Sequence, residues 1–212
     1  CRIMLEGKYL FDVIDFESDL SKYKVIILPD VIRADIDFAK RLREFCDCGG
    51  KVLATGKSAL YENSNEFCLN LGAERIKENP YKPDYFRPLE KIKGMGDTGY
   101  IMYGNGEKIR CIGNELGIRE NPYFNRTRAH FCSHQHTPNS CEYGGAGMTE
   151  GKDGIYIAWN IFADYAQSGE LHLKQMAIFA LDRLLDSAKT LKTNLPAQGI
   201  VCLLYTSPSP RD

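Results

Sequence analysis

A strand, a helix and a second strand follow one another within residues 23–58, and this unit constrains the fold more than any other part of the chain. The apolar run Val25–Leu28 is continuous rather than alternating, as in a strand that is buried on both faces of a parallel sheet. Across residues 34–48 the apolar positions recur every three or four residues, which predicts an amphipathic helix. The pair Gly49-Gly50 ends this helix, and Lys51–Thr55 predicts the second strand. Such a crossover is the repeating unit of doubly wound α/β domains, so we expect an α/β fold.

Shorter patterns predict the remaining elements. The stretch 80–88 has three prolines and predicts a loop, because proline neither donates a ladder hydrogen bond nor fits a helix interior. The stretch 119–147 is rich in Asn, Pro, His and Gly and is expected to be irregular. The other patterns predict a strand at 11–16, a short helix at 64–72, a hairpin of strands 99–103 and 108–112 with its turn at 104–106, a buried strand at 154–160 and a closing amphipathic helix at 169–186.

The composition excludes some classes of protein. A hydrophobic fraction of 43% is enough for a packed core, and a net charge of −1 with both signs interspersed gives no sign of a nucleic-acid or membrane partner. There is no Gly-rich phosphate loop, and we expect no cofactor. Without Cys202, seven of the eight cysteines remain and show no repeated C-x-x-C spacing, so we expect free thiols and a bacterial cytoplasmic location.

Both ends of the sequence suggest a piece of a longer protein. Residue 1 is a cysteine, and residues 1–16 have the pattern of a helix tail running into a strand, so we expect the first strand to be missing at the N-terminus. Residues 202–212 resemble one reading frame of a sequencing adapter, and we expect them to be a non-native tail. The expected division is a domain at 1–188, the start of a following β domain at 189–201, and the tail.

A His-rich segment at residues 130–136 is the most conspicuous group of chemically active side chains. In an extended conformation its histidines and Cys132 would project to one side, and imidazole and thiolate are good zinc or copper ligands. Structural zinc sites usually draw ligands from two separated pairs, however, so we favour a polar loop that contacts a sugar or a partner domain. The candidate sugar contacts are Arg126, His130, His134 and His136; the candidate metal ligands, as the alternative, are Cys132, His134 and His136.

The turn after the second strand is where a catalytic α/β relative would carry its nucleophile. Residues 55–60 read T-G-K-S-A-L, which lacks the last glycine of the G-x-S-x-G elbow and has no cysteine. We therefore expect no working nucleophile here and interpret Ser58 as a helix cap.

Several ordered blocks resemble the β-galactosidase trimerisation domain, which follows the catalytic barrel in family 42 glycoside hydrolases. The similar blocks are Asp19–Pro29, Gly49–Gly56, Phe67–Glu74 and Gly154–Leu185. Residues 122–138 look like an insertion typical of a less characterised relative, the hypothetical glycosyl hydrolases.

This resemblance implies a flavodoxin-like, class I glutamine-amidotransferase-like domain with a doubly wound, mostly parallel sheet. It also implies a non-catalytic role beside an upstream (β/α)8 barrel of the same parent chain, in a homotrimer that acts on a carbohydrate. The barrel's two catalytic carboxylates would lie upstream of Cys1.

Three hypotheses remain open at this point. The first is an accessory and oligomerisation domain of a glycoside hydrolase. The second is an amidase-like or metal-dependent hydrolase that uses Cys132 with His134 or His136. The third is a small-molecule binding module, since flavodoxin-like sheets bind ligands beyond the carboxyl ends of their strands.

Overall fold

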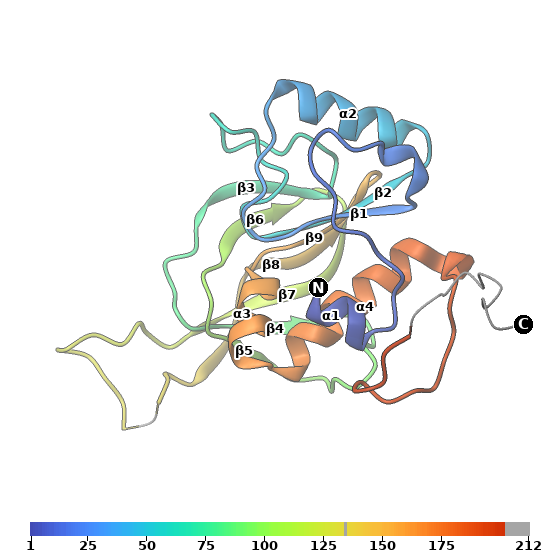
Figure 1. Cartoon of the computed structure of the whole chain (residues 1–212). Coiled ribbons are helices and arrows are strands. Elements are labelled where there is room, and N and C mark those ends of the chain that lie inside the picture. The colour runs from blue at the N-terminus through green and yellow to red at the C-terminus, as the bar shows by residue number, and fades with distance from the viewer. Residues whose placement is uncertain (134, 202–212) are drawn as a thin grey trace, which may run out of the picture.

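The computed structural model describes residues 1–133 and 135–201, and these residues build one nine-stranded mixed sheet with helices packed on it (Figure 1). Three of the strands are parallel: β1 (Val25–Leu28), β2 (Lys51–Thr55) and β9 (Gly154–Ile157). The others pair antiparallel: β3 (Ala73–Glu78), β4 (Asp84–Pro88), β5 (Tyr100–Met102), β6 (Glu107–Cys111), β7 (Asn114–Pro122) and β8 (Asn139–Glu150). One path through the sheet runs β1-β2-β9-β8-β7-β4-β5, and β6 connects β3 to β8.

The predicted crossover is confirmed. Strands β1 and β2 pair in parallel, with Val25 opposite Lys51. Between them lies α2 (Ile36–Asp47), whose first turn is capped by Asp35 through a 2.7 Å hydrogen bond from the Phe38 amide. The apolar side of α2 is buried against the sheet, as its periodicity predicts.

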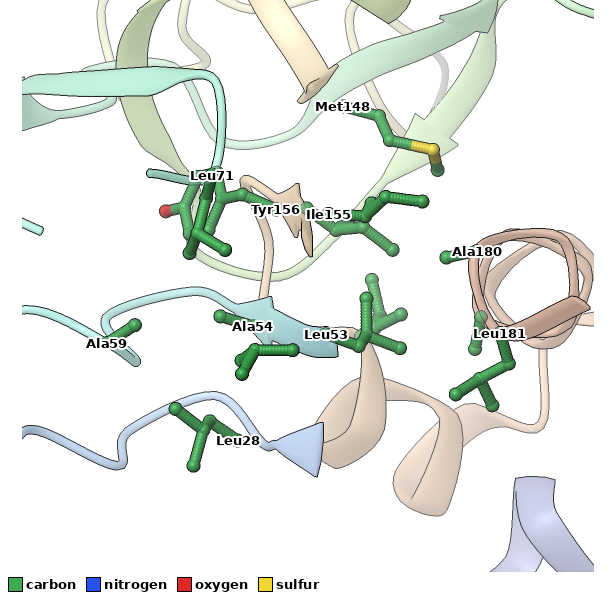
Figure 2. Close-up of a cluster of buried hydrophobic side chains, with 14 of the residues drawn as sticks. Leu28, Leu53, Ala54, Ala59, Leu71, Met148, Ile155, Tyr156, Ala180 and Leu181 are labelled. Carbon is green, nitrogen blue, oxygen red and sulfur yellow. The ribbon is translucent and has the colours of Figure 1, made fainter. Parts of the chain in front are cut away.

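The closing helix is also confirmed, as α4 (Leu171–Leu185). Figure 2 shows Ala180 and Leu181 of α4 facing Leu53 and Ile155 of the two central parallel strands, while Tyr156 points to the opposite side of the sheet. All five side chains are essentially inaccessible to solvent, so this layer forms the centre of the core. The other helical segments are α1 (Arg2–Glu6), η1 (Leu20–Lys22), α3 (Ile161–Ser168) and η2 (Asp186–Ala188).

The expected flavodoxin-like, class I glutamine-amidotransferase-like, doubly wound sheet is wrong. Parallel pairing ends at β9, and from there the antiparallel strands curl the sheet into an open half-barrel (Figure 1). The described residues between 73 and 150 form no α-helix, so the strands here pair antiparallel instead of returning through crossover helices. Strands β7 and β8 shift register several times along their length, and such bulges bend the paired strands.

Several predictions of single strands, helices and loops are also wrong. Residues 11–16 and 64–72 form neither the strand nor the helix expected, and the loop expected at 80–88 contains β4. The expected hairpin does not form, because β5 pairs with β4 whereas β6 pairs with β3 and β8. Long strands β7 and β8 occupy much of the stretch expected to be irregular, which leaves only residues 123–138 as a loop.

The last described residues, 189–201, include no helix or strand and run back across the molecule. Lys8, which is buried, donates a hydrogen bond of 2.9 Å from Nζ to the Ala197 carbonyl. No helix formed by the described residues is long and apolar enough to cross a membrane. The tail predicted to be non-native, 202–212, lies outside the described residues, and its origin stays a prediction.

Candidate functional site

The loop between β7 and β8, residues 123–138, projects from the body of the domain, and we call it the arm (Figure 1). It contains every residue that the sequence suggested for sugar or metal binding. Two aromatic side chains of the arm are largely exposed, Tyr123 at 68% and Phe131 at 69%. Large exposed aromatic rings on a projecting loop are typical of a contact surface.

Internal contacts shape the arm. The rings of Phe124 and His130 stack, with centroids 4.3 Å apart and planes 2° from parallel. The guanidinium of Arg126 donates to the Gln135 carbonyl on the other side of the loop. His136 lies nearer the body, where its Nδ1 is 3.0 Å from the hydroxyl oxygen of Tyr103. Three of the four predicted sugar contacts thus have partners within the domain, and the fourth, His134, lies outside the described residues.

The predicted metal ligands are not brought together as a described site. The thiol of Cys132 donates to the His136 carbonyl, with Sγ and oxygen 3.5 Å apart. Across residues 1–133 and 135–201, no group of three or more His, Cys, Asp or Glu side chains has the geometry to hold a metal ion. Since His134 is one of the three predicted ligands, the prediction itself is not tested.

Both ends of the arm are tied to residues 79–85, which we call the anchor segment. At the first end, Asn125 donates from Nδ2 to the Pro80 carbonyl (2.6 Å) and accepts at Oδ1 from the Lys82 amide (3.1 Å). At the second end, the Tyr85 hydroxyl donates to the buried Thr137 carbonyl (2.7 Å). The arm is therefore fixed at its base.

A buried charge pair lies beneath the anchor segment. The carboxylate of Asp84 accepts hydrogen bonds from Trp159 Nε1 (2.8 Å) and from Asn79 Nδ2 (2.7 Å). Arg119 Nε is also 2.8 Å from Asp84 Oδ2, but its N–H is not directed at that oxygen, so this contact is an ion pair without a well-formed hydrogen bond. The Arg119 guanidinium lies over the Trp159 ring, 4.5 Å from its centroid, and donates from Nη1 to the Glu107 carbonyl.

Burial governs the ionisation of this pair. It raises the pKa of Asp84 to about 6, against the opposing effects of Arg119 and Trp159, and it lowers the pKa of Arg119. The sequence did not reveal this pair, because Asp84 and Arg119 are far apart in the chain and each lies in a segment that was predicted to be a loop.

The turn after β2 holds structural hydrogen bonds where a catalytic relative would carry a nucleophile. Thr55 donates from Oγ1 to the buried carboxylate of Asp30 (2.7 Å), which also accepts from the Ala163 amide in the first turn of α3 (2.7 Å). The Asp30 carboxylate therefore caps α3 from another part of the chain. Ser58 accepts from the Ile32 amide (3.0 Å) and caps no helix, so that prediction is wrong.

Comparison with known proteins identifies the class. Residues 3–78 match the family model of the β-galactosidase trimerisation domain, which confirms the resemblance noted in the sequence. Residues 3–78 are therefore similar to the trimerisation domains of family 42 glycoside hydrolases, and a non-catalytic accessory role fits this likeness. Comparison with proteins of curated function gives no significant match.

Solved structures give a nearer relative. The chain is 52% identical to α-L-fucosidase isoenzyme 2 from Paenibacillus thiaminolyticus, with a TM-score of 0.90 over 94% of this chain and 30% of that one. It is 17% identical to a β-galactosidase from Rahnella sp. R3 (TM-score 0.59, 85% of this chain, 26% of that one). It is 20% identical to a β-galactosidase from Bacillus circulans sp. alkalophilus (TM-score 0.59, 85% and 25%). The chain thus spans less than a third of each of these relatives, and the two β-galactosidases bear on the fold alone.

Proposed function

We propose that this chain is the non-catalytic assembly domain of a larger glycoside hydrolase whose substrate is an α-L-fucoside. The observation that carries the proposal is the 52% identity to an α-L-fucosidase over 94% of the chain. The β-galactosidases are 17% and 20% identical, so they support the architecture and not the sugar. The sequence suggested a β-galactosidase-like parent; the identity favours a fucosidase within the same broad class.

In this proposal the domain packs on an upstream (β/α)8 barrel and holds the parent in a homotrimer. The trimerisation-domain match over residues 3–78 supports self-association. Residues 1–188 form the assembly domain, and residues 189–201, which lack regular structure, lead into a following β domain. A cytoplasmic location is part of the proposal, supported by the buried free thiols of Cys46 and Cys68.

The arm is proposed to line the sugar site of a barrel, either its own or that of a neighbouring subunit. The proposed sugar contacts are Arg126, His130, His136 and, from its place in the sequence alone, His134. Arg126 and His130 are exposed on the arm, and guanidinium and imidazole groups donate hydrogen bonds to sugar hydroxyls. Tyr123 and Phe131 add exposed aromatic surface that can stack on an apolar sugar face.

The full-length parent enzyme tests these proposals. We expect hydrolysis of 4-nitrophenyl α-L-fucoside well above that of the β-D-galactoside, and a solution mass of three chains by light scattering. Arg126→Ala and His130→Ala should each lower kcat/KM for the fucoside by roughly tenfold, the loss expected when a hydrogen bond to substrate is removed. A strict monomer would contradict the assembly role, a galactoside preference would contradict the substrate, and unchanged kinetics in both variants would contradict the role of the arm.

A further inference from the structure

The described residues of the arm contact one another, and contacts at its base hold the arm to the domain. Its own contacts, between Phe124 and His130 and between Arg126 and Gln135, tie the loop to itself. Backbone hydrogen bonds in both directions between Thr127 and His130 close a tight turn near its middle. Such contacts fix the shape of the arm but not the direction in which it leaves the domain.

That direction is set where the arm meets the anchor segment, and Asn125 makes the first connection. Its side-chain amide donates to the Pro80 carbonyl and accepts from the Lys82 amide, so it bridges two backbone groups of opposite polarity. An amide side chain presents its donor and its acceptor side by side in one plane, as these two backbone groups require. Aspartate would place a second oxygen against the Pro80 carbonyl, and alanine would make neither hydrogen bond.

The anchor segment is in turn held by the core. Asn79 donates from Nδ2 both to the Tyr81 carbonyl (3.0 Å) and to Asp84 Oδ2 (2.7 Å). Asp84 contacts Trp159 and Arg119, which are fully buried. A continuous series of contacts therefore runs from the core through the anchor segment to Asn125.

We propose that Asn125 is a positioning residue of the parent enzyme: it fixes the direction of the arm and so the place at which the arm meets the sugar, without contacting the sugar itself. This inference rests on the proposed function of the arm. A small misplacement of a substrate-contacting loop weakens binding strongly, because the contacts depend on distance and direction. Loss of Asn125 should therefore act on the arm as a whole.

The first experiment measures the position of the arm without using activity. Trypsin cleaves after Arg126 and Arg128, both exposed in the arm, and native-state cleavage follows the population in which the loop has opened. In the full-length parent, Asn125→Ala should speed cleavage at these two sites roughly tenfold, as expected from two lost hydrogen bonds. Tyr85→Phe, which removes the hydroxyl that holds the other end, should also speed it. Asn63→Ala, in the exposed loop between β2 and β3, is the matched control and should leave the rate unchanged.

The second experiment measures the kinetics of the same variants on 4-nitrophenyl α-L-fucoside. Asn125→Ala should raise KM roughly tenfold and change kcat less than about twofold, because the chemistry on the barrel is untouched. Cleavage at the wild-type rate in both anchor variants, with an unchanged unfolding midpoint, would overturn the positioning role. If Arg126→Ala impairs activity and Asn125→Ala does not, the arm contacts sugar but Asn125 does not position it. If Asn125→Ala speeds cleavage and no arm variant changes KM, the anchor is real but the proposed sugar contact falls, and the inference falls with it.

Discussion

Replacing Arg119 by methionine removes the positive charge that lies against the buried carboxylate of Asp84. The two side chains are 0% and 1% exposed, so water cannot take over the role of the lost guanidinium. Removing one partner of a buried ion pair typically costs about 3–5 kcal/mol, because the other charge stays buried. Trp159 and Asn79 still donate to Asp84, so we expect a loss near the lower limit, about 3 kcal/mol at pH 8.

The cost should depend on pH in a direction that the pKa of Asp84 fixes. Burial already raises this pKa to about 6, above the ordinary value of 3.8, so the folded protein holds the proton more tightly than the unfolded chain does. Unfolding therefore releases a proton between these two values, and stability falls as pH rises through this range. Without Arg119 the pKa rises further and the range extends upward. The variant should then lose stability between pH 6 and pH 8 at up to about 1.4 kcal/mol per pH unit, whereas the wild type should not.

Urea unfolding at several pH values measures how the stability of Arg119→Met depends on pH. Trp159, the only tryptophan in the sequence, donates a hydrogen bond to Asp84, so its fluorescence reports when the surroundings of the charge pair become exposed to water. The destabilisation of Arg119→Met should be about 1 kcal/mol at pH 5 and about 3 kcal/mol at pH 8. Arg110→Met is the matched control, since Arg110 pairs with Glu74 at the surface with 67% of its side chain exposed, and a surface pair contributes at most about 1 kcal/mol. A loss in Arg119→Met that is equal at both pH values, or larger at pH 5, would refute the reasoning.

Three further changes test other parts of the domain. Asp30→Ala removes the remote cap of α3 and should lower stability by about 2 kcal/mol in thermal denaturation, and an unchanged midpoint would show that the cap does not matter. The pKa of Glu6 is lowered to about 2, chiefly by the hydrogen bond from Lys174, so this contact stabilises the fold above pH 4.5 and is lost as the pH falls towards 2. Lys174→Met should raise the Glu6 pKa in a carboxyl NMR titration and flatten the acid limb of the stability curve, and an unmoved titration would contradict the assignment. Gly154→Ala would place a methyl group on the Val52 carbonyl between β2 and β9, and we expect a loss of about 3 kcal/mol or more, so a normal circular dichroism melt would exclude this close approach.

The elements that sequence reasoning found are those whose pattern is local. The helix α4 repeats its apolar positions every three to four residues, and the run Lys51–Thr55 is bounded by glycines, so each is identified without its neighbours. Strand β4 could not be found in this way, because it begins with the charged Asp84 and ends with Pro88. Its charge is balanced by Arg119 of β7 and accepts hydrogen bonds from Trp159 and Asn79, and none of these partners can be identified from the sequence of β4 itself.

In the candidate site, too, the local sequence could not show contacts between residues that are far apart in the chain. The histidines of residues 130–136 could be noticed as a cluster, but their contacts involve residues outside it, such as Phe124 and Tyr103. The backbone hydrogen bonds between Thr127 and His130 likewise join the cluster to a residue outside it. Nor could Asn125 be recognised, since its partners are backbone groups of the anchor segment, which carry no side-chain signal.

The resemblance to trimerisation domains was correct about the family and wrong about the sheet, and the extent of the match explains both results. The family model covers residues 3–78, which include the parallel pair β1 and β2 and the helix between them. A doubly wound sheet is a fair expectation from that part alone. The residues between β3 and β9 instead build antiparallel strands, and this part of the chain carries the arm, the anchor segment and the buried charge pair. The parallel part is therefore the segment that the family model matches, and the arm, the anchor segment and the buried charge pair lie where the crossover pattern stops.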